Sequence, residues 1–347
     1  MARARSHLAD ERIYRSVGRV LPSNARPAAI RAAGRADADY GAPGTPDWRE
    51  IDWSEHVHDV TIAGRRVRYA DYGSGPEEPV VFIHGWTSNW QCWLENIPAM
   101  AAAGRRVIAL DLPGSGLSEM PVEKISISGY ARTVEALCEH LGLATIVVIG
   151  NSMGGFISAE LAIAQRSRVE RLVLVSAAGI SSASMRNGPA IAFGRALQLG
   201  VGQRWKHTTR HPMLVRPRLR HAAVSTIFRH PTRISTDLLY EMMGGMGREG
   251  FYDQLIANIS YDYTERLGEI AAPTLVVWGR EDGLVPVADA YEYDRIIPDS
   301  RLLILEDTGH VPMAERPQTF NTAVLSFVEE TGSANEPGSH QAAVQSA

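Results

Sequence analysis

Cysteine is scarce in this sequence, whose 347 residues include only Cys92 and Cys138. Neither belongs to a CxxC motif or lies near a cluster of histidines, so the usual ligand patterns of a structural metal site are missing. We therefore expect two free thiols in a reducing compartment, and neither a bound metal nor another cofactor.

Long apolar runs are also missing. No stretch approaches the roughly 18 apolar residues of a membrane-spanning helix, and residues 1–23 have no continuous apolar core of signal-peptide length. These absences predict a soluble, cytoplasmic protein. Hydrophobic residues make up 45% of the chain and charged residues 21%, which is ordinary for a soluble globular protein. A chain of 347 residues is long enough for one large α/β domain with an insertion, or for two domains of ordinary size.

Acidic residues are nearly absent from two segments, although the formal net charge of the chain is −4. Residues 1–36 contain eight Arg against two acidic residues, and residues 185–236 contain nine Arg, one Lys and no acidic residue. Such segments would suit weak peripheral contact with an anionic membrane surface. The simpler interpretation, which we favour, is that they are solvated helix faces.

Nucleic acid is not expected as a partner of these basic segments. They contain no recognisable helix-turn-helix, zinc or RNP motif. The expected partner is a small-molecule substrate. No feature of the sequence specifies an oligomeric state.

The chain divides into five parts by its hydrophobic patterns. Residues 1–50 are predicted to form an N-terminal arm and linker, and residues 331–347 a disordered tail. Residues 51–182 and 266–330 alternate apolar strand patterns with helical ones, which predicts a mostly parallel, doubly wound sheet covered on both faces. Residues 183–265 have helical patterns and no buried-type strand, so we expect a helical cap inserted between two strands.

The individual elements follow from the same patterns. We expect a β-hairpin within residues 58–75, turning at Ala63-Gly64, and buried strands within residues 79–86, 105–116, 144–152, 171–176, 273–282 and 300–310. Helices are expected over Trp90–Ala103, Ser128–Leu141, Met153–Gln165 and Pro317–Glu330.

The stretch "GNSMGG", residues 150–155, encloses one serine hydroxyl between small residues directly after an apolar run. It matches G-x-S-x-G between a strand and a helix. In that setting Ser152 occupies a sharp turn, and Gly150 and Gly154 prevent clashes where strand and helix approach. The N–H groups at the helix start then face a negatively charged intermediate. We interpret Ser152 as a nucleophile rather than as part of a purely structural turn.

With this motif inside an alternating α/β pattern, the chain resembles the α/β-hydrolases over about residues 55–330. In that family the triad follows the chain order nucleophile, acid, histidine. The resemblance implies that Asp282, in "WGREDGLVP", is the acid and that His310, in "DTGHVP", is the base that activates Ser152. Glu281 is the weaker candidate for the acid because Asp282 fits the family's spacing "WGxxDxxxP".

The stretch "HGW", His84 to Trp86, resembles the oxyanion loop of the same family. The resemblance implies that the backbone N–H groups of Trp86 and Met153 hold the oxyanion. His84 and Gly85 are then expected to support the loop, with His84 fixing it through hydrogen bonds rather than accepting protons.

These residues together predict a serine hydrolase that works through an acyl-enzyme. Haloalkane dehalogenases and epoxide hydrolases of this fold have an aspartate where Ser152 stands, and lipases of the hormone-sensitive type have "HGGG", which this chain lacks. We expect a capped carboxylesterase or lipase-like enzyme for small, apolar esters.

Two alternatives stay open. Carbon–carbon bond hydrolases of aromatic ring-cleavage products closely share "GNSMGG", although their oxyanion loop is usually richer in glycine than "HGWTSNW". A ligand-binding receptor or scaffold with slow or lost hydrolysis is the alternative from another functional class.

Overall fold

The computed structural model describes residues 27–181, 214–245 and 248–330. Three of the predicted parts lie wholly or partly outside the described residues. These are the tail over residues 331–347, residues 1–26 of the arm, and residues 183–213 and 246–247 of the cap.

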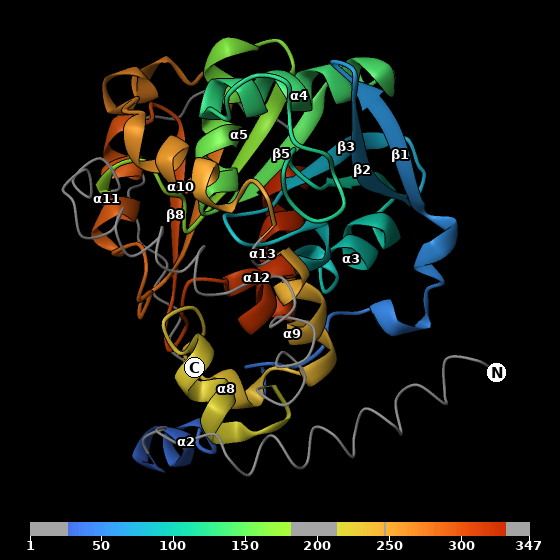
Figure 1. Ribbon diagram of the computed structural model, residues 1–347. Coiled ribbons are helices and arrows are strands. Elements are labelled where there is room, and N and C mark those ends of the chain that lie inside the picture. Colours follow the sequence, from blue (N-terminus) through green and yellow to red (C-terminus); the bar gives the residue numbers. More distant parts are fainter. Residues whose placement is uncertain (1–26, 182–213, 246–247, 331–347) are drawn as a thin grey trace.

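Eight strands form one sheet in the part of the chain that the structure describes. They are β1 (Val57–Ile62), β2 (Arg65–Tyr72), β3 (Glu77–Ile83), β4 (Arg105–Leu110), β5 (Ile146–Asn151), β6 (Val169–Val175), β7 (Thr274–Gly279) and β8 (Ser300–Leu305). Their spatial order is β1-β2-β4-β3-β5-β6-β7-β8, and every pairing from β4 to β8 is parallel. The prediction of a mostly parallel sheet is confirmed (Figure 1).

The antiparallel edge of the sheet is the expected hairpin. β1 pairs with β2, and β2 pairs in the antiparallel sense with β4. Ala63 and Gly64 connect the two strands with φ angles of 49° and 74°, both in the left-handed region. Two left-handed residues in succession form the turn that suits the natural twist of a two-residue hairpin. The predicted turn is therefore confirmed.

Helices lie on both faces of the sheet and beyond its carboxyl edge (Figure 1). They are α2 (Pro27–Ala33), α3 (Ile97–Ala102), α4 (Ile127–His140), α5 (Met153–Ala164), α8 (Pro217–Val224), α9 (Thr236–Met242), α10 (Phe251–Ser260), α11 (Ala288–Ile296), α12 (Pro312–Glu315) and α13 (Pro317–Glu329).

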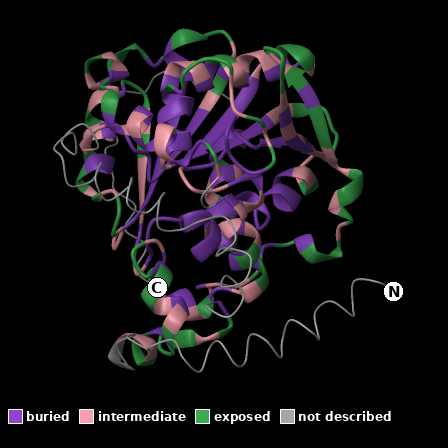
Figure 2. Ribbon diagram, viewed as in Figure 1, coloured by how far each residue is buried: buried purple, intermediate pink, exposed green. Residues whose placement is uncertain are grey.

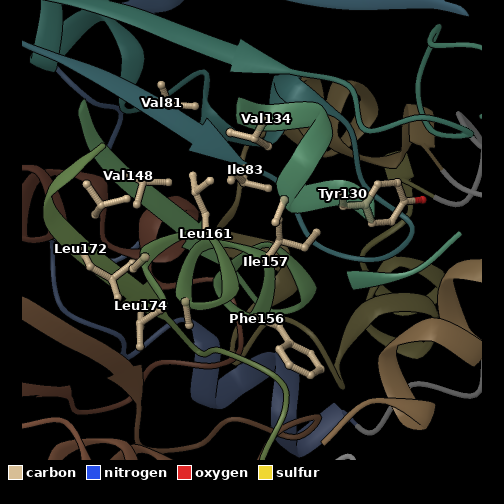
Figure 3. Close-up of a cluster of buried hydrophobic side chains, with 14 of the residues drawn as sticks. Val81, Ile83, Tyr130, Val134, Val148, Phe156, Ile157, Leu161, Leu172 and Leu174 are labelled. Carbon is tan, nitrogen blue, oxygen red and sulfur yellow. The ribbon is translucent and has the colours of Figure 1, made fainter. Parts of the chain in front are cut away.

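Alternate side chains of the central strands enter two separate hydrophobic clusters, because successive strand residues point to opposite faces. On β3, Val81 and Ile83 belong to the cluster that α4, α5 and α11 cover. Val80 and Phe82 belong to the cluster that α3 and α13 cover. Figure 2 shows the central strands as buried, and Figure 3 shows α5 over the first cluster. The doubly wound arrangement is confirmed.

The two cysteines lie in different clusters. Cys92 packs on the α3 and α13 side, and Cys138 packs on the α4 and α5 side. Both are free and buried, and burial raises the pKa of the Cys138 thiol to about 12. With the sheet between them, the two thiols cannot form a disulfide with each other.

One helix prediction is wrong in part. Instead of a single helix over Trp90–Ala103, the structure has a short 3-10 turn over Trp90–Trp93 followed by α3. Pro98 lies in the first turn of α3, where its missing N–H costs no hydrogen bond. In one continuous helix the Pro98 N–H would donate to the Leu94 carbonyl, and proline has no N–H, so the longer helix is interrupted and a new one begins with Pro98 in its first turn.

Between β6 and β7, the described residues form helices and turns and no strand. α8, α9 and α10 lie beyond the carboxyl ends of the parallel strands (Figure 1), and α2 of the N-terminal arm contacts α8. The assignment of residues 183–265 as a cap stays a prediction. Among the described helices, none combines the length and the apolar character that a membrane span needs.

The central strands are expected to dominate the stability of the fold. Replacing the fully buried Leu174 by Ala should lower the free energy of unfolding by about 2–5 kcal/mol, because a cavity replaces packed methyl groups. Leu117→Ala is the matched control, since Leu117 is 47% exposed and its loss should cost about 0.5 kcal/mol or less. Urea unfolding of both variants measures the difference, and equal effects would contradict it.

Candidate active site

Ser152 occupies a strained turn between β5 and α5. Its φ of 55° and ψ of −119° are rare for a residue with a side chain. The Ser152 N–H donates to Val175 O at 2.9 Å, and the Ser152 carbonyl accepts from Ala178 N at 3.0 Å. Hydrogen bonds to the end of β6 and the residues after it thus hold the unusual backbone conformation in place.

The glycines around Ser152 are required by backbone contacts. A Cβ on Gly150 would lie 2.2 Å from Gly154 O, and a Cβ on Gly154 would lie 2.1 Å from Ile83 O. The first turn of α5 therefore touches the ends of both β5 and β3. A Cβ on Gly85 would lie 3.1 Å from the Cβ of Ser152, so the "HGW" loop lies directly against the serine.

Asp282 and His310 lie in the loops that follow β7 and β8. His310 Nδ1 is 2.7 Å from Asp282 Oδ2, and the two side chains are 6% and 0% exposed. The other oxygen, Asp282 Oδ1, accepts from Leu284 N at 2.8 Å and Val285 N at 2.9 Å. The carboxylate is thereby oriented toward the ring. A proton on Nδ1 leaves Nε2 as the nitrogen that can accept a proton.

Glu281 has a different contact from its neighbour Asp282. Its Oε2 accepts from Thr308 N at 3.0 Å, which ties the β7 loop to the β8 loop. The geometry therefore favours Asp282 over Glu281 as the partner of His310.

Asn151 joins the serine to the histidine loop. Its Nδ2 donates to Val175 O at 3.1 Å and to His310 O at 3.2 Å. The residue before Ser152 is therefore hydrogen-bonded to the backbone of His310. Asn151 is absent from the predicted site residues. Its sequence signal is a buried amide that ends an otherwise apolar strand.

His84 supports the "HGW" loop from inside the protein. The ring is fully buried, with Nδ1 at 2.7 Å from Gly85 O and Nε2 at 3.0 Å from Leu112 N. Because a carbonyl faces Nδ1 and an N–H faces Nε2, the ring is neutral with its proton on Nδ1. Burial lowers the pKa of His84 to about 4. His84 is thus placed to fix the loop.

Trp86 connects the same loop to α10. Its Nε1–H donates to Phe251 O at 2.8 Å, and the two rings lie 4.8 Å apart between centroids. Met153 is the first residue of α5, where a backbone N–H has no acceptor within its own helix. The predicted oxyanion donors thus belong to two segments in contact beside Ser152. Their role stays a prediction.

The described residues include no group of three or more His, Cys, Asp or Glu side chains that could hold a metal ion. Serine, aspartate and histidine are residue types suited to nucleophilic and proton-transfer chemistry.

A sequence profile described as the alpha/beta hydrolase fold matches residues 78–317. The chain belongs to the α/β-hydrolase family. The predictions of the family and of the fold are confirmed.

Known relatives of this α/β-hydrolase catalyse different reactions. It is 33% identical to the 2-hydroxy-6-oxononadienedioate/2-hydroxy-6-oxononatrienedioate hydrolase of Escherichia coli (strain K12), over 78% of this chain and 93% of the relative. It is 31% identical to the dihydrolipoyllysine-residue acetyltransferase component of the acetoin cleaving system of Pseudomonas putida, over 78% of this chain and 68% of the relative.

A similar solved structure is that of Est816, described as an N-acyl homoserine lactone degrading enzyme. It superposes with a TM-score of 0.61 at 26% identity, covering 78% of this chain and 100% of the other. These matches support hydrolase chemistry for this α/β-hydrolase and leave several bond types as candidates.

The backbone contact at Gly154 gives a direct test of the turn. Gly154→Ala should destabilise the protein by about 3 kcal/mol and lower its melting temperature by roughly 10 °C, because the new Cβ meets the Ile83 carbonyl. The matched control is Gly268→Ala, whose Cβ would have only an ordinary contact at 3.9 Å. Calorimetry should show a near-native melting temperature for the control, and a near-native Gly154→Ala would contradict the contact.

His84 should make the fold sensitive to acid. The unfolded chain protonates this ring below pH about 6.5, whereas the folded protein does so only near pH 4. The unfolding free energy therefore falls by about 3 kcal/mol as the pH drops through this interval. Burial raises the pKa of Asp111 to about 6, which contributes the opposite slope between pH about 6 and about 3.8.

The comparison between wild type and His84→Gln isolates the contribution of His84, because Asp111 is present in both proteins. Urea unfolding from pH 7 to pH 4 should give the variant lower stability but a smaller loss in acid. Identical pH slopes for the two proteins would show that His84 is not the group responsible.

Proposed function

We propose that this α/β-hydrolase cleaves carboxylic esters of apolar acyl groups, with Ser152 as the nucleophile. One observation carries the proposal: a serine held at φ 55° is joined, through Asn151, to the loop of a buried His310–Asp282 pair. A serine hydroxyl is a weak nucleophile unless a base and an orienting group stand beside it. In the proposed site His310 is the base and Asp282 is the orienting group.

The proposed reaction has two similar halves. Ser152 Oγ attacks the ester carbonyl while His310 Nε2 takes its proton, and Asp282 keeps the ring in the required tautomer. The N–H groups of Trp86 and Met153 bind the oxyanion, each for roughly 3–4 kcal/mol of transition-state stabilisation. His310 then protonates the leaving alcohol. A water molecule attacks the acyl-enzyme by the same route and releases the acid.

The apolar character of the acyl group is inferred from the residues beside the "HGW" loop. The half-buried Trp86 ring packs against Phe251 of α10, which gives the region an aromatic surface. Other apolar residues of the predicted cap are part of the core: Phe228 and Met242 are 3% and 8% exposed. They therefore support the cap and do not argue for a substrate pocket.

The first test compares wild type with Ser152→Ala on p-nitrophenyl esters of short, medium and long acyl chains. The variant should lose about 10⁴-fold or more in kcat/KM, because the covalent step has no other nucleophile. Ser54→Ala is the matched control at an exposed serine and should keep wild-type activity. Hydrolysis that survives in Ser152→Ala would refute the assignment of the nucleophile.

Carbon–carbon bond hydrolysis is the second candidate. The observation in its favour is the 33% identity to the E. coli hydrolase, which covers 93% of that relative. The same Ser152, Asp282 and His310 would serve this reaction. An assay with 2-hydroxy-6-oxononadienedioate beside the ester series decides between the two, since the higher kcat/KM identifies the bond. Binding of either compound without turnover would instead favour a receptor.

A further inference from the structure

Glu315, the last residue of α12, is a fully buried carboxylate outside the predicted triad. Burial raises its pKa. Its hydrogen-bond partners are backbone N–H groups and one phenol, and among the described residues no Arg or Lys forms an ion pair with it. Burying a charged carboxylate without a cation costs folding free energy, and hydrogen bonds to the carboxylate offset part of that cost.

The side chain of Glu315 accepts hydrogen bonds from the residues on both sides of His310. Gly309 N donates to both Glu315 oxygens at 3.0 Å, and Val311 N donates to Oε1 at 3.2 Å. Between them, the N–H of His310 donates to Ile227 O of the predicted cap at 2.7 Å. Three successive backbone N–H groups are therefore held, so the backbone at His310 has little freedom to shift.

The same carboxylate reaches two further segments. Its Oε2 accepts from Tyr40 O–H of the N-terminal arm and from Arg229 N of the predicted cap at 2.8 Å. The Tyr40 oxygen in turn accepts from His230 N at 2.8 Å. Tyr40 is 1% exposed. One buried carboxylate thus joins the arm, the predicted cap and the histidine loop.

The backbone of the arm is attached at the same place. Gly41 N donates to Glu315 O at 2.7 Å, and a Cβ on Gly41 would lie 2.5 Å from Arg233 O. Arg316, the next residue after Glu315, pairs with Asp37 at 2.9 Å. Residues 37–41 are therefore anchored on both sides of Tyr40, which keeps its hydroxyl aimed at the carboxylate.

We propose that Glu315 and Tyr40 are positioning residues for His310, and that residues 37–41 of the arm are thereby a working part of the active site. This inference rests on the proposed function of His310 as the base. Neither residue touches the reacting atoms. They act by holding the loop that sets the distance from His310 to Ser152, and a misplacement of about 1 Å is enough to reduce catalysis by about 100-fold.

Tyr40→Phe is the principal test, because it removes one hydroxyl and keeps the buried ring. We expect kcat to fall about tenfold with KM nearly unchanged, since the loop of the base is loosened and the substrate contacts are not. The downfield Nδ1 proton signal of His310 should also shift or broaden, because the ring is held less well against Asp282.

Tyr130→Phe is the matched control. Tyr130 is also buried, and its hydroxyl contacts Pro113 O and Gln254 Nε2 rather than the histidine loop. Both variants should lose similar thermal stability, but only Tyr40→Phe should alter kcat and the His310 Nδ1 proton signal. Glu315→Gln should have a larger effect than Tyr40→Phe, because one carboxylate oxygen becomes an NH₂ group that faces N–H donors. If Glu315→Gln fails to fold, Tyr40→Phe still decides.

Two readouts separate this proposal from the proposed function. The rate at which a fluorophosphonate labels Ser152 reports activation by His310 without any ester. The downfield proton signal of His310 Nδ1 reports the bond to Asp282 without any reaction. Wild-type protein that is labelled but cleaves no ester refutes the proposed function, while the labelling rate of Tyr40→Phe still tests the positioning. If even labelling is absent, the proton signal alone decides.

A folded Tyr40→Phe protein with the wild-type kcat, labelling rate and Nδ1 proton signal would overturn the proposal. A slower labelling rate or a shifted or broadened signal, with Tyr130→Phe unchanged, would support it.

Discussion

The close contact between the first turn of α5 and the ends of β3 and β5 is the constraint on which the candidate site depends. It leaves no space for a Cβ at Gly150 or Gly154. It also forces Ser152 into the left-handed region, where most side chains are disfavoured. The resulting turn places the serine against Gly85 of the "HGW" loop, and the preceding residue, Asn151, is hydrogen-bonded to the backbone of His310.

The remaining site residues are held by loops that are bonded to one another rather than by the sheet alone. Asp282 is oriented by N–H groups of its own loop, and Glu281 ties that loop to the loop of His310. His310 is then held from the far side by Glu315. Such a network keeps the side chains of Asp282 and His310 aligned without a bound substrate, and for a predicted acid and base this is the preorganisation that rapid proton transfer needs.

Most of the sheet could be predicted because its strands are apolar runs bounded by glycines and polar residues, and such runs have few alternatives in a large α/β domain. The Trp90–Ala103 region could not, because helical periodicity continues across Pro98 while the backbone does not. The Asp282–His310 pairing followed from chain order within a family. The contacts of Asn151, Glu315 and Tyr40 could not be predicted, because they join residues up to 275 positions apart and have no local pattern.

The hydrogen bond from the Trp86 indole to Phe251 O has a consequence for how this protein can change over evolution. Substrate preference in a capped enzyme is altered most readily by substitutions in the cap, because that part is remote from the sheet. Here the helix α10 is attached to the side chain of a residue whose own backbone is the predicted oxyanion donor. A substitution that shifts α10 to admit a larger molecule therefore also shifts that donor. The predicted role of Trp86 thus implies that selectivity and turnover are coupled through one indole. A variant that accepts a new substrate would then also have to restore the position of the loop to recover its turnover rate.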